Sequence, residues 1–344
     1  MTLRTYIISR ILLTIPMIFI LLTMVFVVIR ILPGDPVLLH FEKVEDPKAI
    51  EEVRQKLGLD KPLWLQYIEY LSGLFRGDLG KSMQDYSSVG EQIFSAFPAT
   101  LELAIFSMII AVSIGIFLGV EASKSHDKPK DYVIRVFGIV TYAIPVFFLG
   151  ITFQMIFGVA LHWLPVGGRV PNPTLEPKGL TLGNLHFSTG LYTVDSLLEG
   201  NVYKLVQTFR HLFLPSLTLG LVLAGVFIRL TRSNMFETLR QDFVTAARAR
   251  GLKETTVIYG YALRNAFLPV LTMIGLQFAT LLGGAILTET TFSWPGLGRY
   301  IVDRISFRDY TAIQGAIVVF GLFVSVVSLV VDLLYAYLDP RIRL

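Results

Sequence analysis

The sequence predicts an all-α integral membrane protein with six transmembrane helices, and three observations support this prediction. Hydrophobic residues make up 53% of the 344-residue chain and charged residues only 16%, and the mean hydropathy is +0.62. Soluble domains usually carry about 25% charged residues. Six uncharged runs approach or exceed the roughly 20 apolar residues that a membrane-spanning helix needs. Basic residues are also concentrated between alternate runs, as in a multi-pass protein with a fixed orientation.

The six runs define the predicted spans. The first follows Arg4 and Arg10, but it is longer than the ~7–15 apolar residues of a signal-peptide core, so we expect a retained helix. The third is long enough to span with a tilt. The runs cover residues 11–29, 103–120, 136–163, 212–228, 266–288 and 311–331. Prolines are expected to kink these helices, and they occur at Pro16, Pro145, Pro215 and Pro269.

The distribution of Lys and Arg predicts that both chain termini are cytoplasmic. Segments predicted inside carry basic residues at about twice the density of segments predicted outside, which matches the positive-inside rule. The inside segments are 1–10, 121–135, 229–265 and 338–344. The outside segments are 30–102, 167–211 and 289–310.

The spacing of the spans divides the chain into three parts. Residues 1–98 hold the first helix and an extracellular region between helices 1 and 2, residues 99–337 hold the other five helices, and residues 338–344 form a cytoplasmic tail. Within the extracellular region, 49–57 is expected to form an amphipathic helix and 64–74 to lie along the membrane surface. This region is either a small cap or a docking surface for a partner.

One outer segment has no predicted structure. Residues 164–211 are rich in Gly, Pro, Asn and Thr, which favour turns. The part from 172 to 202 has no assigned role.

Several chemistries are excluded by the residues themselves. The chain has no cysteine, so it can form neither a disulfide nor a thiolate metal site, and its five histidines are scattered. Gly80-Lys81-Ser82 ends like a phosphate-binding loop, but Phe75 occupies the position of the required earlier glycine. Few ionisable residues lie in the spans, which argues against a proton relay. We therefore expect no enzyme activity, cofactor or metal in this chain.

The inner segment 229–265 carries the strongest local signal. Residues 242–250 read as a helix with an acid at its start, Gly251 as a turn with positive φ, and 255–263 as a second helix. Small residues leave one helix face open to close approach, and Arg248 and Arg250 frame that face. The spacing alone fits a docking helix and a basic loop that only sets topology equally well.

This segment resembles the E-A-A-x-x-x-G loop of ABC importer permeases. The matching residues are Thr245, Ala246, Ala247, Arg248, Ala249, Arg250 and Gly251, followed by Leu252. Thr245 stands in place of the Glu, and Leu268-Pro269 comes later than the general consensus. Both departures resemble the dipeptide and oligopeptide branch of these permeases. The same branch is resembled by the motifs Leu32-Pro33-Gly34-Asp35-Pro36, Gly77-Asp78-Leu79-Gly80, Pro98-Ala99-Thr100-Leu101-Glu102-Leu103 and Glu289-Thr290-Thr291-Phe292-Ser293-Trp294-Pro295-Gly296-Leu297-Gly298.

The resemblance implies a type I ABC importer permease fold and a set of partners. These are a homologous second permease in a heterodimer, two ATPase subunits that bind ATP and Mg, and an extracellular substrate-binding protein, with no nucleic acid. The coupling loop, 242–264, would lie against an ATPase. The cargo would be di- or oligopeptides crossing the cytoplasmic membrane; oligosaccharides, glutathione or nickel are alternatives within the same architecture. An ion-coupled secondary transporter is a further alternative from another class.

Polar positions inside the spans are candidates for the translocation path. Gln154 lies in the third span, and Gln277 and Thr280 lie in the fifth. Polar residues in a membrane bundle usually hold helices together, so a packing role is the alternative for all three.

Overall fold

The structure is a computed structural model that describes residues 3–31, 55, 60–182 and 185–338. The amphipathic helix predicted over 49–57 falls outside the described residues except for position 55, and the cytoplasmic tail falls outside them except for Leu338.

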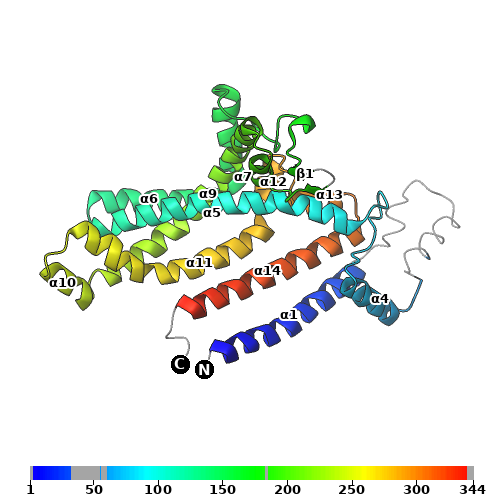
Figure 1. Ribbon diagram of the computed structural model, residues 1–344, viewed down its shortest axis with the longest axis horizontal. Helices are drawn as coiled ribbons and strands as arrows, with labels where there is room; N and C mark the ends of the chain where they lie inside the picture. Colours follow the sequence, from blue (N-terminus) through cyan, green and yellow to red (C-terminus); the bar gives the residue numbers. More distant parts are fainter. Residues whose placement is uncertain (1–2, 32–54, 56–59, 183–184, 339–344) are drawn as a thin grey trace.

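Long apolar helices make up most of the described chain. Five of them are long and apolar enough to cross a membrane. They are α1 (Leu3–Ile31), α5 (Val89–Lys124), α9 (Val202–Thr238), α11 (Leu263–Gly284) and α14 (Tyr310–Leu338). In Figure 1, α1, α5, α11 and α14 run along the long axis of the molecule, and the first turn of α1 and the last turn of α14 lie toward the end that carries α10 (Asp242–Ala249).

The third predicted span is bent rather than tilted. α6 (Pro129–Ala143) is followed by α7 (Val146–Phe153), which continues as the π-helical segment η1 (Gln154–Ala160). The two halves meet at 99°, so the described residues contain six spans only if this bent pair counts as one. Pro145 has no N–H to donate and disfavours helical geometry at the residue before it, and Ile144 accordingly has ψ 128°. The proline was expected to kink this run; the structure breaks it completely.

α5 and α9 begin well before their apolar runs. α5 begins at Val89, where the Ser88 hydroxyl accepts the Glu91 N–H, and α9 begins after Asn201, whose side chain accepts the Lys204 N–H at 3.1 Å. Hydropathy marks only the part of a helix that suits lipid, whereas the backbone hydrogen bonds continue until a cap ends them.

α5 and α9 form the centre of the bundle. Gly115 and Gly119 of α5 lie directly against Phe227 and Thr231 of α9, and a Cβ built on Gly119 would lie 2.6 Å from the Thr231 Cβ. Glycines four residues apart allow helix backbones to approach this closely. The surrounding core is apolar and includes Leu103, Met108, Leu212, Leu219, Phe227, Leu282 and Trp294.

α1 lies at the edge of the bundle. It buries Leu22, Val25 and Ile29 against Val318 of α14, and its C-terminal half contacts α4 (Leu63–Phe75). The Tyr67 hydroxyl is 2.6 Å from the Thr23 hydroxyl. The aromatic run predicted over 64–74 is thus a helix fastened to α1.

The segment without predicted structure is partly ordered into short elements. It contains a 3₁₀ turn, η2 (Pro173–Leu175), an antiparallel pair of strands, β1 (Leu180–Leu182) and β2 (Leu185–Phe187), and α8 (Tyr192–Leu198). Leu180 pairs with Phe187, and Leu182 pairs with Leu185. This small hairpin is an exception to the all-α expectation. The region from α7 to the start of α9 projects from one side of the long helices (Figure 1).

Candidate coupling site

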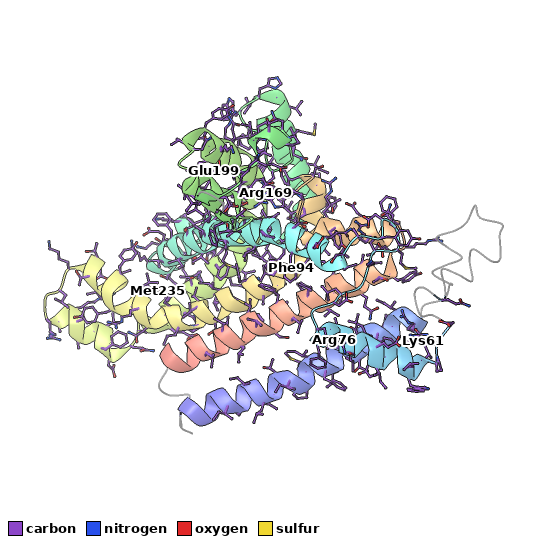
Figure 2. All side chains as sticks on the ribbon, turned by 45° about the vertical axis from the view of Figure 1, so that its right-hand side comes forward. Lys61, Arg76, Phe94, Arg169, Glu199 and Met235 are labelled. Atoms are coloured by element: carbon purple, nitrogen blue, oxygen red, sulfur yellow. The ribbon has the colours of Figure 1, made fainter. Side chains whose placement is uncertain are left out.

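α10 is held against the bundle by one apolar face. It follows α9 after three residues, and its Val244 and Ala247 are 0% and 3% exposed. Both pack with Met235 of α9, and Figure 2 shows Met235 at this end of the molecule. The rest of this cluster comes from α5, from η3 (Thr256–Ala262) and from α11, and consists of Val120, Val257, Ile258, Ala262 and Ala266. The helix is therefore joined to three spans.

The opposite face of α10 is exposed. Thr245, Ala246, Arg248, Ala249 and Arg250 are all exposed. The predicted small face included Ala247, but the structure places that residue on the buried side. The exposed patch of this face consists of Ala246 and Ala249, with the two arginines beside it.

Gly251 fixes the direction in which the chain leaves α10. Its φ is +73°, the left-handed region that glycine enters without a steric penalty, and no atom lies within 4 Å of a Cβ built on it. The Leu252 N–H donates to the Ala247 carbonyl at 3.4 Å, and Gly251 N–H donates to Arg248 at 2.9 Å. This is the usual glycine C-terminal cap of a helix, so the predicted turn is present.

An ion pair crosses that turn. The Arg248 guanidinium donates to the Glu254 carboxylate at 2.7 and 3.2 Å. The hydrogen bond from Arg248 lowers the pKa of Glu254, and the same bond raises the pKa of Arg248. Both side chains are partly exposed, so the pair contributes little stability, but it orients Arg248 toward the loop.

The three candidate path residues lie in different environments. The Gln154 amide donates to the Val166 carbonyl at 2.5 Å and to the Thr291 carbonyl at 3.0 Å, so it ties η1 to two outer segments. Gln277 is half-buried on α11, and Thr280 is exposed on the same helix, where its hydroxyl donates to the Leu276 carbonyl at 2.9 Å. Gln154 therefore has a bracing role in this arrangement, whereas Thr280 faces outward from the described chain.

A buried ion pair joins α5 to the projecting region between α7 and α9, and the sequence reasoning missed it. Arg169 donates to Glu102 of α5 at 2.6 and 3.0 Å, and their side chains are 5% and 1% exposed. Glu102 also accepts the Thr193 N–H at 2.7 Å. Arg169 lies in the projecting region in Figure 2. The available signal was Glu102 itself, an acid directly before an apolar run.

A second buried carboxylate organises the Trp-Pro-Gly motif. Glu289 of α12 (Ile286–Thr291) is 0% exposed; it accepts the Thr100 hydroxyl at 2.6 Å and the Arg299 N–H of α13 (Leu297–Ser306) at 2.9 Å. Gly296 is required because a Cβ there would collide with this carboxylate. Burial raises the pKa of Glu289. Trp294 donates to the Ala99 carbonyl at 2.8 Å, so α12 and α13 are fastened to α5.

The comparisons with known proteins agree with this architecture. Residues 111–344 match the family described as the inner membrane component of binding-protein-dependent transport systems, and residues 3–104 match the N-terminal part of such components. The chain belongs to this family, which confirms the resemblance to ABC importer permeases.

Whole-length relatives make the membership more specific. The dipeptide transport system permease protein DppB of Alkalihalophilus pseudofirmus is 40% identical over 98% of this chain and 99% of its own length. The DppB of Escherichia coli K12 is 39% identical, with 98% of each chain covered. The glutathione transport system permease protein GsiC of Escherichia coli O6:H1 is also 39% identical, with the same coverage.

A solved structure shows the same fold. It is an inward-facing form of the MetNI methionine ABC transporter, with a TM-score of 0.52 and 14% identity, covering 71% of this chain and 94% of the other. The family match and this likeness of fold together confirm the multi-pass ABC permease architecture predicted from the sequence.

Proposed function

We propose that this permease carries di- or oligopeptides into the cell through a pathway powered by ATP hydrolysis in separate subunits. The cargo assignment is supported by the relatives of nearly full length, which are named for dipeptide transport. The coupling assignment is supported by one observation above all: α10 exposes Ala246 and Ala249 on one face while its other face is packed into three spans.

We propose four partner chains for this subunit. Two ATPase subunits would bind ATP and Mg, and one of them would receive the exposed face of α10. A homologous second permease would complete the pathway, and an external substrate-binding protein would deliver the peptide. The family description, which refers to binding-protein-dependent transport, supports this set. This chain itself would hold no cofactor and hydrolyse nothing.

The proposed orientation places α10 and both termini in the cytoplasm. Support comes from α10, the start of α1 and the end of α14, which lie toward one end of the molecule (Figure 1). The adjoining segments are those with the higher density of Lys and Arg. In this orientation the region with Arg169 and Glu102 is extracellular, and Gln277 and Thr280 lie on the span that follows the coupling loop.

A second cargo is favoured by a specific observation. GsiC, named for glutathione transport, is 39% identical to this chain over 98% of its length. Glutathione is itself a modified tripeptide, so the two cargoes share charged termini and amide groups.

The test is uptake by the complete complex in proteoliposomes. Radiolabelled dipeptide, tripeptide and glutathione are added outside the vesicles together with the binding protein. ATP or ADP is enclosed in the vesicle lumen, which corresponds to the cytoplasm, and each assay is run with and without an ionophore. The proposal expects ATP-dependent, ionophore-insensitive uptake of peptide. Uptake that an ionophore abolishes while ATP is present would instead identify a secondary transporter. ATP-driven uptake of glutathione alone would reassign the cargo.

A further inference from the structure

A bidentate ion pair joins α6 to α9 near the coupling helix. The Arg232 guanidinium donates to Asp131 through Nε at 2.6 Å and through Nη2 at 2.7 Å. Asp131 is fully buried and also accepts the Asp127 N–H at 3.2 Å, and the Arg232 side chain is 20% exposed. Neither residue belongs to α10 or to the candidate path.

The position of Arg232 connects this pair to α10. It lies six residues before Thr238, where α9 ends, and Met235 between them packs against Val244 and Ala247 of α10. A displacement of α10 therefore carries the end of α9 with it. Arg232 is part of that end.

The other α6–α9 contacts lie away from the coupling end and, among the described residues, include no ion pair. Ile134 packs with Ile228, and the two backbones approach so closely that a Cβ built on Gly225 would collide with the Gly138 carbonyl oxygen. This close approach fixes the two helices at one point, and the angle between them at the coupling end depends on the contacts made there. A bidentate Arg–carboxylate pair adds geometric specificity as well as attraction.

The far end of this helix pair reaches the outer segments. Beyond the bend at Pro145, a Cβ built on Gly150 of α7 would lie 3.0 Å from the Phe292 ring, and Gln154 binds the Thr291 carbonyl. α6 and α7 therefore form a bent lever with one arm beside α9 and the other against the end of α12.

We propose that Asp131 and Arg232 are positioning residues that make this lever follow α10, so that ATPase movement reaches the outer segments. This proposal rests on the proposed function, because it needs an ATPase that moves α10. The pair defines the angle between α6 and α9 at the coupling end. Without the Asp131–Arg232 pair, α10 and the end of α9 move but α6 does not follow them.

The first measurement is the ratio of peptide taken up to ATP hydrolysed by the complete complex in proteoliposomes. The double variant Asp131→Asn with Arg232→Gln removes both charges together, so no buried charge is left unpaired. We expect the complex to assemble at the wild-type level and the ratio to fall by about 2-fold to about 30-fold, the range of coupling energies measured along such networks. Arg232→Lys keeps the charge without the planar guanidinium, and its uptake-to-ATP ratio is expected to lie between those of the wild type and the double variant.

Lys130→Ala is the matched control. It removes an ion pair between Lys130 of α6 and Glu121 of α5 at the same end of the bundle, but the Lys130 side chain is 55% exposed. Exposed pairs contribute little, so the uptake-to-ATP ratio should stay at the wild-type value.

The second measurement follows the lever directly. Because the chain has no cysteine, spin labels can be attached at Tyr132→Cys on α6 and Lys253→Cys after α10, both exposed positions. The distance between the labels should be the same in nucleotide-free and ATP-trapped wild-type complexes. In the double variant it should differ between the two states.

The outcomes separate the two levels of inference. A double variant with a wild-type ratio and an unchanged label distance would overturn the positioning role. A double variant that fails to assemble would also overturn it, by showing that the pair serves folding. A wild-type complex with no ATP-driven uptake would instead remove the proposed function on which the lever depends.

Discussion

The Arg169 guanidinium lies 3.6 Å from the centroid of the Tyr192 ring and also binds the Glu102 carboxylate. One cation thus joins α5, the loop after η1 and the start of α8. This side chain also donates to the Gly190 carbonyl at 2.8 Å. It is one of several contacts that hold the segment without a sequence prediction, together with Glu102, which accepts the Thr193 N–H.

Arg169→Met is expected to destabilise the outer region strongly, because it leaves the Glu102 carboxylate buried without a counter-charge. Breaking one side of a buried pair costs about 3–5 kcal/mol. The measurement is the thermal unfolding of the complex in detergent. The double variant Arg169→Met with Glu102→Leu should recover part of the loss, since only the Thr193 N–H and the Gly190 carbonyl then lack their partners. Equal unfolding temperatures for the single variant and the wild type would contradict this account.

Substitutions at Gly251 should rank by backbone conformation, since no side-chain contact opposes them. Gly251→Ala places a Cβ in the left-handed region, at a cost of about 1–2 kcal/mol. Gly251→Pro cannot adopt φ +73° at all and is expected to abolish ATP-driven uptake while the protein remains in the membrane. Uptake assays and membrane immunoblots measure the two effects. Gly200→Ala is the control, because Gly200 also has a positive φ and no atom within 4 Å of an added Cβ but lies outside the coupling loop; it should keep wild-type uptake.

Leucine at Ala246 and leucine at Ala247 should fail in different ways. Ala247→Leu forces extra carbon atoms into a packed cluster, which typically costs about 1–3 kcal/mol, so the permease itself should unfold at a lower temperature. Ala246→Leu leaves folding unchanged but adds bulk to the exposed face. It should reduce co-purification of the ATPase subunits. If both variants bound the ATPases normally, the exposed face of α10 would not be the docking surface.

The stability of the outer end should depend on pH through Glu289. Burial raises its pKa in the folded protein, so the neutral form is favoured by folding. The unfolding free energy should therefore fall as the pH rises from the ordinary glutamate pKa of about 4.3 through the raised folded value. Glu289→Gln should remove this part of the pH dependence. Glu289→Ala should cost about 1–3 kcal/mol at the low end of this pH range because the Thr100 hydroxyl and the Arg299 N–H lose their acceptor, and this cost should shrink as the pH rises. Denaturation curves across pH 4–8 would measure both.

Sequence reasoning predicted the features that depend on local composition. The apolar runs identified the spans, and the Gly251 turn follows from glycine, the residue type that adopts a positive φ without a steric penalty. The exposed face of α10 was predicted only in part. Val244 and Ala247 lie three residues apart, a spacing that marks the buried stripe of a helix, but the small size of Ala247 led to its prediction on the exposed face.

Long-range partners could not be predicted in the same way. Nothing near Glu102 in the sequence indicates Arg169, and nothing near Asp131 indicates Arg232. Each pair joins residues more than sixty positions apart, and either acid would read equally well as a solvated charge at a helix end. The angle of 99° at Pro145 is also a product of tertiary packing, since a proline alone specifies a break but not its size.

The interlocked glycine faces of α5 and α9 limit how this permease can open. Gly115 and Gly119 bring the two backbones so close that Phe227 and Thr231 pack directly against the glycines. Neither helix can therefore slide along the other without a steric clash. When the permease opens or closes, α5 and α9 must then move together as one rigid body, and sliding between helices has to occur where this pair contacts its neighbours.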